Sequence, residues 1–256
     1  QGESGIAAMM VVLHHVAFRL HLQSGSPAEW FPSGSSGVDL FFVISGFVMQ
    51  HVSAGRHGEH SAPSTFIRER AARVLPVYWL ATLLAVVARA AIGLGTPWPV
   101  IAVSTLLIPS QATYVLANGW TLSYEMAFYA LLALSLLLPS RSAERATIAV
   151  LVGLAALGWL LKPEDPAGSF ATASLYLEFV FGMLVYRAYA AGRRLTRPGW
   201  IALLCVGLSA WWATAADGWM FDRALSWGLP AAIVLSALVL GNPTVGIAGR
   251  TLGVLG

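Results

Sequence analysis

The sequence has few charged residues for its length. Of its 256 residues, 15 are Lys or Arg and 12 are Asp or Glu, so that 11% are charged, whereas about a quarter of a soluble domain is charged. So few charges cannot cover a water-exposed surface of this size, which excludes an ordinary soluble protein. Disordered chains combine low hydrophobicity with high charge, but 57% of this chain is hydrophobic. The composition therefore indicates a polytopic membrane protein.

Cysteine and lysine are nearly absent. The single cysteine, Cys205, excludes a disulfide scaffold and a multi-cysteine metal site, and we expect no metal cofactor. All basic residues except Lys162 are arginines, and the net charge is +3. A small positive net charge does not by itself indicate a nucleic-acid partner, and we expect none. The positions of the arginines along the chain are more informative than their number.

Apolar runs of about 20 residues dominate the chain, a length typical of membrane helices. Strand-like alternation is absent, which disfavours a barrel. The first run lacks the basic start and the small-residue cleavage site of a signal peptide, so it is predicted to be a retained helix. We therefore predict an all-α transmembrane helical bundle with eight complete spans, near 5–22, 36–52, 75–93, 120–138, 146–161, 170–189, 199–215 and 224–240.

The segment 97–118 is apolar but is not predicted to cross the membrane. Its prolines, Pro97, Pro99 and Pro109, bracket only about ten residues, too few for a bilayer. If this segment does not cross and the N-terminus is cytoplasmic, eleven of the fifteen basic residues fall on the inner side. That distribution follows the positive-inside rule. We therefore predict that both ends of the chain are cytoplasmic.

Four ionisable residues lie within or at the edge of the apolar runs: His15, Asp39, Glu125 and Glu178. Charges inside a bilayer are costly and mark function by default. In the predicted topology, His15, Asp39 and Glu125 lie at similar depth toward the outer side. A neutral histidine beside carboxylates suits general base catalysis, because a carboxylate orients the imidazole and stabilises its protonated form.

Each of these residues also has a structural interpretation. A histidine in a membrane helix can serve as a hydrogen-bonding group between helices. Asp39 can be a helix-start residue favoured by the helix dipole. Glu125 shares a helix face with Tyr129 and needs a partner when buried. Glu178 shares a face with Gly182, and for this residue polar contact between helices is the favoured interpretation.

Residues 66–76 predict a short amphipathic helix that continues into the third span. Arg70 and Arg73 are three residues apart and therefore share a helix face. They can be anchors that attract anionic lipid. Alternatively, they form a guanidinium pair for a phosphorylated ligand, since arginine binds phosphate through two hydrogen bonds.

Four segments follow one another in the first half of the chain. They are Gly5-Ile6-Ala7-Ala8 leading to His14-His15; Gly37-Val38-Asp39-Leu40-Phe41-Phe42-Val43-Ile44-Ser45-Gly46-Phe47; Arg70-x-x-Arg73 with Pro76-Val77-Tyr78-Trp79; and Trp120-x-Leu122-x-x-Glu125-x-x-Phe128-Tyr129. In this order they resemble the membrane-bound acyltransferase 3 family. In the second half, Leu177-Glu178-Phe179 is similar to the branch that acetylates bacterial exopolysaccharides.

The resemblance implies one integral-membrane acyltransferase domain over 1–256, in the bacterial inner membrane. Its activity would move an acetyl group from cytoplasmic acetyl-CoA to a hydroxyl of an exported or cell-surface polysaccharide. His15 matches the first-helix histidine of the family, which favours it over His14. It would be the general base or a transient acyl carrier, oriented by Asp39 or Glu125.

The same resemblance assigns the ligand-binding residues. Arg70 and Arg73 match the arginine pair that faces the phosphates of CoA. Glu178, Trp120 and Tyr129 are expected to contact the glycan acceptor. The lipid bilayer and the glycan are the partners expected.

Two departures from the family pattern leave other functions open. The family usually has Leu-Arg where this chain has Glu3 and Ser4, and it continues into further helices where this chain ends at Gly256, so we interpret the chain as truncated. A proton-coupled transporter is one alternative, although we find no inverted repeat and no matching broken helices. An inactive membrane scaffold subunit is the other.

Overall fold

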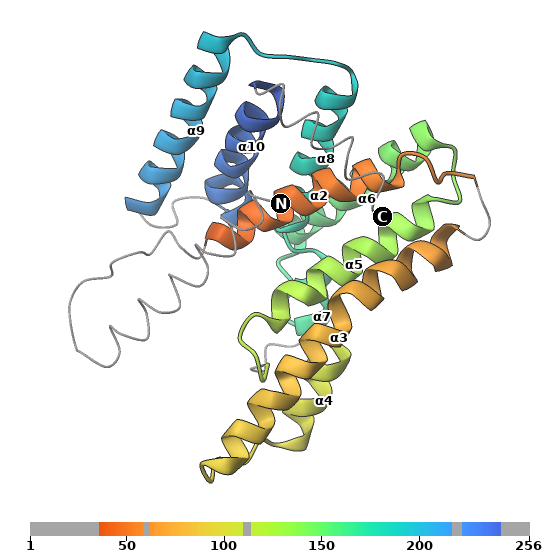
Figure 1. The fold of residues 1–256 in the computed structure, drawn as a ribbon, viewed down its shortest axis with the longest axis vertical. Helices are drawn as coiled ribbons and strands as arrows, with labels where there is room; N and C mark the ends of the chain where they lie inside the picture. Colours follow the sequence, from red (N-terminus) through yellow and green to blue (C-terminus); the bar gives the residue numbers. More distant parts are fainter. Residues whose placement is uncertain (1–35, 59–61, 110–113, 217–221, 242–256) are drawn as a thin grey trace. The chain divides into compact units, whose positions relative to one another are not determined.

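The computed structural model describes residues 36–58, 62–109, 114–216 and 222–241. All regular structure in these ranges is helical, as predicted (Figure 1). The helices are α2 (Gly37–Ser53), α3 (Ala62–Ala91), α4 (Trp98–Leu106), α5 (Gly119–Ser135), α6 (Ser140–Leu161), α7 (Pro166–Ala171), α8 (Tyr176–Ala190), α9 (Arg197–Ala216), the π-helix η2 (Ala224–Gly228) and α10 (Leu229–Gly241). The first predicted span, 5–22, lies outside the described residues.

The chain folds into two compact units. Unit 1 comprises 1–52 and 177–256, and unit 2 comprises 53–176. The described helices of unit 1 are α2, α8, α9, η2 and α10, and those of unit 2 are α3 to α7. Asp39 and Glu178 therefore belong to unit 1, whereas Arg70, Arg73 and Glu125 belong to unit 2.

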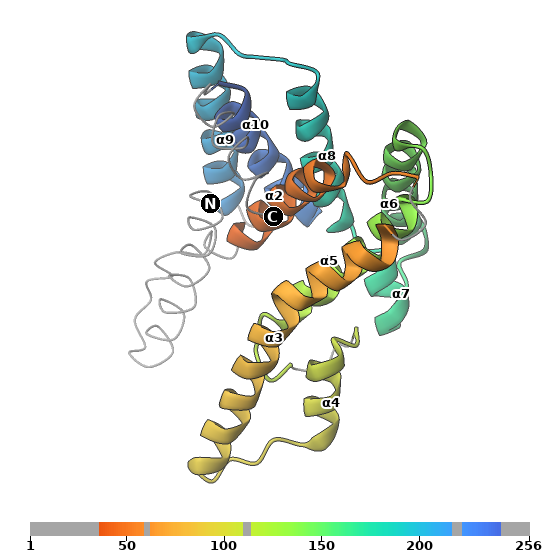
Figure 2. The ribbon, with the colours of Figure 1, turned by 45° about the vertical axis from the view of Figure 1, so that its right-hand side comes forward.

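In unit 2, α3 packs beside α5, and α5 packs beside α6 (Figures 1 and 2). The amphipathic segment 66–76 continues into the apolar part of α3 without interruption, which confirms that prediction, and Pro76 lies inside the helix. The Tyr78 hydroxyl of α3 donates to the Ser104 carbonyl of α4 over 3.1 Å. This hydrogen bond fastens the short α4 to its neighbour.

Local sequence signals explain the short helices. Pro97 precedes α4, a proline occupies its first turn, and Leu107 ends it in the left-handed conformation at φ 52°. With nine residues, α4 is about 14 Å long, shorter than the hydrocarbon core of a bilayer. The Asp165 side chain caps α7 by accepting from the backbone N–H of Gly168 over 2.7 Å.

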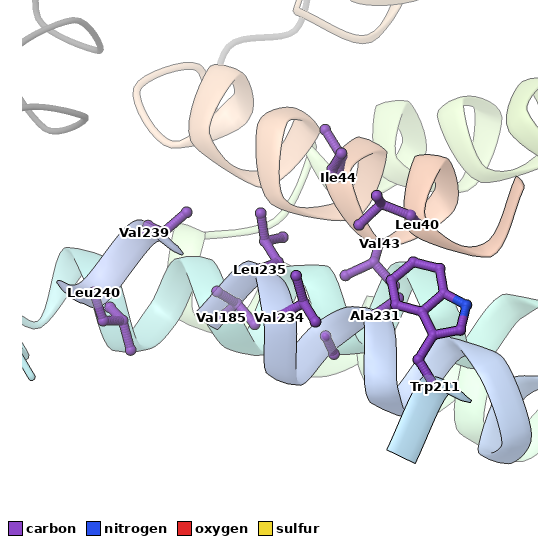
Figure 3. Close-up of a cluster of buried hydrophobic side chains, with 11 residues drawn as sticks. Leu40, Val43, Ile44, Val185, Trp211, Ala231, Val234, Leu235, Val239 and Leu240 are labelled. Carbon is purple, nitrogen blue, oxygen red and sulfur yellow. The ribbon is translucent and has the colours of Figure 1, made fainter. Parts of the chain in front are cut away.

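Unit 1 is built around a cluster of buried apolar side chains from four helices (Figure 3). α2 contributes Leu40 and Val43, α8 contributes Val185, α9 contributes Trp211, and α10 contributes Leu235 together with its neighbours. α9 and α10 lie side by side. The Trp211 ring nitrogen also donates to the Ser36 hydroxyl over 2.5 Å, which fixes the start of α2.

Two glycines bring α2 and α8 into backbone contact. A methyl group at Gly46 would collide with the Phe179 backbone, and one at Gly182 would collide with the Val43 backbone. Small residues at a crossing allow membrane helices to approach this closely. Gly46 and Gly182 are therefore packing residues of the α2–α8 crossing.

Four helical segments in the described part of the chain are long and apolar enough to cross a membrane: Ala62–Ala91, Ser142–Leu161, Pro166–Ala190 and Ala224–Gly241. The shorter apolar α2 also coincides with a predicted span. Large apolar side chains such as Leu83, Leu84 and Leu160 are exposed on these helices, a surface suited to lipid rather than water. The predicted span 170–189 differs in detail, because α7 ends at Ala171 and α8 begins only at Tyr176.

Candidate functional site

Asp39 lies in the first turn of α2 and is fully buried. The Arg223 guanidinium binds it through two parallel hydrogen bonds, Nε to Oδ1 and Nη2 to Oδ2, both 2.8 Å. The Arg223 side chain itself is 18% exposed. A bidentate guanidinium–carboxylate pair is among the strongest polar contacts in proteins and fixes the plane of the carboxylate. Asp39 is therefore more than a residue favoured at a helix start.

Glu178, in the first turn of α8, is also fully buried. Neither of its carboxyl oxygens has a hydrogen-bond partner of ordinary geometry among the described residues. The charged groups that act on it are the carboxyl groups of Asp39 and Asp222 and the Arg223 guanidinium. The structure thus brings Asp39 and Glu178, 139 residues apart in sequence, to one buried cluster with one arginine, which we call the acid pair with Arg223.

The π-helix η2 follows Arg223 directly. The Asp222 carboxylate accepts from the Ala224 backbone N–H over 3.0 Å, which fixes the start of the segment. The Trp227 ring lies 5.4 Å from the Arg223 guanidinium carbon, within the range of a cation–π contact. Single π-helical turns frequently occur at functional sites.

A second polar cluster lies in unit 2, between α3 and α5. Glu125 is 4% exposed and accepts a hydrogen bond from the Tyr129 hydroxyl, one helical turn further along α5. The Tyr129 ring packs edge-on against Phe66 of α3 at 6.3 Å between ring centroids. The Arg70 guanidinium carbon lies 5.7 Å from the same Phe66 ring. Glu125, Tyr129 and Arg70 therefore belong to one cluster.

The two arginines of α3 differ in their surroundings. The Arg70 side chain is 12% exposed, and its Nε atom is buried without a hydrogen-bond partner in the described structure. Arg73 is exposed. Glu69 lies 3.9 Å from Arg70 and 2.6 Å from Arg56, so two guanidinium groups share this carboxylate, and Arg73 follows one turn after Arg70 on α3. Such a cationic group suits a phosphorylated ligand.

Trp120 belongs to an aromatic cluster at the start of α5. Its ring packs edge-on against Tyr124 at 6.1 Å, and Tyr124 lies 4.5 Å from Phe170 of α7 and 5.5 Å from Tyr176. The rings of Trp120, Tyr124 and Phe170 are partly exposed, whereas Tyr176 is buried. Aromatic side chains that combine an apolar face with a polar tip suit contacts with amphipathic ligands.

Sequence reasoning did not single out Arg223. The signal that could have pointed to it is that two buried carboxyl groups, Asp39 and Glu178, require a nearby cation. His15 lies outside the described residues, so its position relative to Asp39 and Glu125 stays a prediction. Within the described ranges, no three His, Cys, Asp or Glu side chains come close enough to hold a metal ion.

The sequence matches the acyltransferase domain of the acyltransferase 3 family over residues 5–254, a range that includes both units. It is 33% identical to "Exopolysaccharide production protein ExoZ" of Rhizobium meliloti (strain 1021) over 220 residues, 82% of this chain and 68% of ExoZ. It is 29% identical to "Putative membrane-bound transacylase BcsY" of Komagataeibacter xylinus over 207 residues, 72% of this chain and 50% of BcsY. No solved structure matches the chain significantly. The chain belongs to the acyltransferase 3 family of membrane acyltransferases.

Proposed function

We propose that this protein is an O-acyltransferase that moves an acetyl group from cytoplasmic acetyl-CoA to a hydroxyl of an exported or cell-surface polysaccharide. The observation that carries the proposal is the acyltransferase family match over residues 5–254. The similarity to a protein named for exopolysaccharide production supports the acceptor class. We place the enzyme in the bacterial inner membrane, with eight spans and both chain ends cytoplasmic.

The reaction needs a base, a donor site and an acceptor site. His15 would remove the proton of the acceptor hydroxyl, whose oxygen then attacks the thioester carbonyl; the C–S bond breaks, and the CoA thiolate takes up the proton. Asp39 or Glu125 would orient the imidazole and stabilise its protonated form. Both carboxyl groups are buried and held, Asp39 by Arg223 and Glu125 by Tyr129, which supports an orienting role.

Arg70 and Arg73 are proposed to bind the CoA phosphates. Arg70 supports this role, because it is shielded, rests on Phe66, and keeps a buried N–H donor without a partner in the described structure. An anion at this position would supply the missing acceptor. Tyr129 joins this donor site to Glu125.

On the acceptor side we propose Trp120, Tyr129 and Glu178. Trp120 offers a partly exposed ring within the aromatic cluster of α5. Glu178 lies beside Asp39 and would act on the acceptor through that contact.

Acetyl content of the polysaccharide tests this function in the native host. The gene is deleted and then complemented with the wild type, His15→Ala or His14→Ala, and acetyl groups on the purified polysaccharide are counted by NMR. We expect loss of acetyl on deletion, restoration by the wild type and by His14→Ala, and no restoration by His15→Ala. Unchanged acetylation on deletion contradicts the proposed function; restoration by His15→Ala contradicts only the assignment of the base.

A further inference from the structure

We propose that Arg223 is a positioning residue of the acyl-transfer reaction, which acts by holding the Asp39 carboxyl group in one fixed orientation. The inference rests on the proposed function and adds a residue that no family motif of the first half of the chain contains. Arg223 lies 184 residues from Asp39 in sequence. Their contact is therefore a product of the fold of unit 1.

The geometry of the pair supports a positioning role. Both Asp39 oxygens accept from Arg223, each at 2.8 Å, so the carboxylate cannot rotate without losing a hydrogen bond. Each carboxylate oxygen retains a second lone pair, which stays available to an imidazole or to a protonated carboxyl group. A fixed carboxylate with free lone pairs is what an orienting group for a histidine requires.

Charge balance bears on Glu178 as well. Two fully buried carboxyl groups, Asp39 and Glu178, share one guanidinium. The remaining acidic neighbour, Asp222, adds negative charge rather than compensating it. A second uncompensated charge buried in this site would be strongly unfavourable. The geometry therefore pairs the guanidinium with the Asp39 carboxyl group and leaves Glu178 beside that pair without a cation of its own among the described residues.

The segment after Arg223 packs against this cluster. The Trp227 ring supports the guanidinium at 5.4 Å. Gly228 leaves room for Glu178, because a methyl group there would lie 2.6 Å from Glu178 Cγ. Both residues belong to the π-helix η2. One five-residue segment thus supports the arginine on one side and accommodates the second acid on the other.

A double-mutant cycle on the full chain in membrane vesicles tests whether Arg223 acts through Asp39. The chains are the wild type, Arg223→Gln, Asp39→Asn and the double variant, with Arg197→Gln as control, because Arg197 is an exposed arginine of the same unit. Transfer of labelled acetyl gives kcat and the KM for acetyl-CoA. Thermal unfolding in detergent gives the folded amount of each chain.

We expect Arg223→Gln to lower kcat about tenfold or more when Asp39 is present, and less than about twofold in the Asp39→Asn chain, because two residues that act as a unit are not additive. The KM for acetyl-CoA and the activity of Arg197→Gln should not change. Equal losses in both backgrounds, or an active Arg223→Gln chain, would overturn the proposal.

Two further variants decide the matter if Arg223→Gln does not fold or Asp39→Asn has no residual activity. Arg223→Lys keeps the charge but loses the second parallel hydrogen bond, and we expect lower kcat with an unchanged KM; wild-type kcat would overturn the proposal. Arg197→Lys is the matched control, because Arg197 is exposed, and we expect wild-type kcat and KM for it. A wild-type chain without any transfer activity would contradict the proposed function itself. An active wild type whose kcat does not depend on Arg223 would contradict only the positioning role of Arg223.

Discussion

Replacing Gly46 by alanine should separate α2 from α8. The added methyl group would meet three backbone atoms of Phe179, with the carbonyl carbon and Cα at 2.8 Å and the carbonyl oxygen closer still. Backbone atoms cannot turn aside as a flexible side chain does, so one helix must move. Overpacking of this kind costs about 1–3 kcal/mol, against a gain of up to about 1 kcal/mol from the better helix propensity of alanine. We expect a net loss of stability.

Gly153→Ala is the matched control. Gly153 is also inside a helix, α6, but a methyl group there would meet nothing within 4 Å. Only the propensity gain remains, so this variant should be at least as stable as the wild type. Thermal unfolding in detergent measures the stability of both variants. For a chain of this size, a change of 1 kcal/mol in stability shifts the unfolding temperature by about 2–4 °C. Equal unfolding temperatures for the two variants would refute the close α2–α8 crossing.

The crossing also positions the acid pair with Arg223. Asp39 lies seven residues before Gly46, two helical turns away on the same face of α2, and Glu178 lies one turn before Gly182 on α8. A shift of α8 away from α2 would therefore move Glu178 away from Asp39. We expect Gly46→Ala to lower the acyl-transfer activity by a larger factor than it lowers the amount of folded protein. Gly153→Ala should keep the wild-type activity and the wild-type amount of folded protein.

Three further substitutions test unit 2. Tyr129→Phe removes the donor to the buried Glu125 and should cost about 1–3 kcal/mol of stability together with most of the transfer activity, as measured by unfolding and label transfer. Arg70→Gln should raise the KM for acetyl-CoA several-fold, and Arg68→Gln, an exposed arginine of the same helix, should not; equal values for the two would contradict the donor assignment. Asp165→Ala removes the cap of α7 and should lower stability by about 0.5–2 kcal/mol without changing the KM for acetyl-CoA.

Local patterns in the sequence predicted the helices well. Apolar runs located α2, α5, α9 and α10, and the prolines around 97–109 bracket the short helix α4. The amphipathic start of α3 was predicted from spacing within one helix. These features depend on residues close together in the chain, which a single sequence displays directly.

Contacts between distant segments could not be predicted in this way. Asp39 and Arg223 are 184 residues apart, and no periodicity links them. Glu178 was predicted from its helix face to be a polar contact between helices, but the helix face could not identify its neighbour, the Asp39 carboxyl group of α2. The link from Arg70 through Tyr129 to Glu125 likewise joins residues that the predicted topology had placed toward opposite sides of the membrane.

Transfer of radiolabelled acetyl from acetyl-CoA in membrane vesicles tests the central claim most directly. Vesicles that contain the chain receive labelled acetyl-CoA and purified exopolysaccharide, and both label on polysaccharide and free CoA thiol are measured. An acyltransferase produces the two in equal amounts, and His15→Ala produces neither while His14→Ala produces both. Thiol release without label on polysaccharide would contradict the proposed acceptor class. The absence of both products with the wild type would contradict the proposed acyltransferase activity.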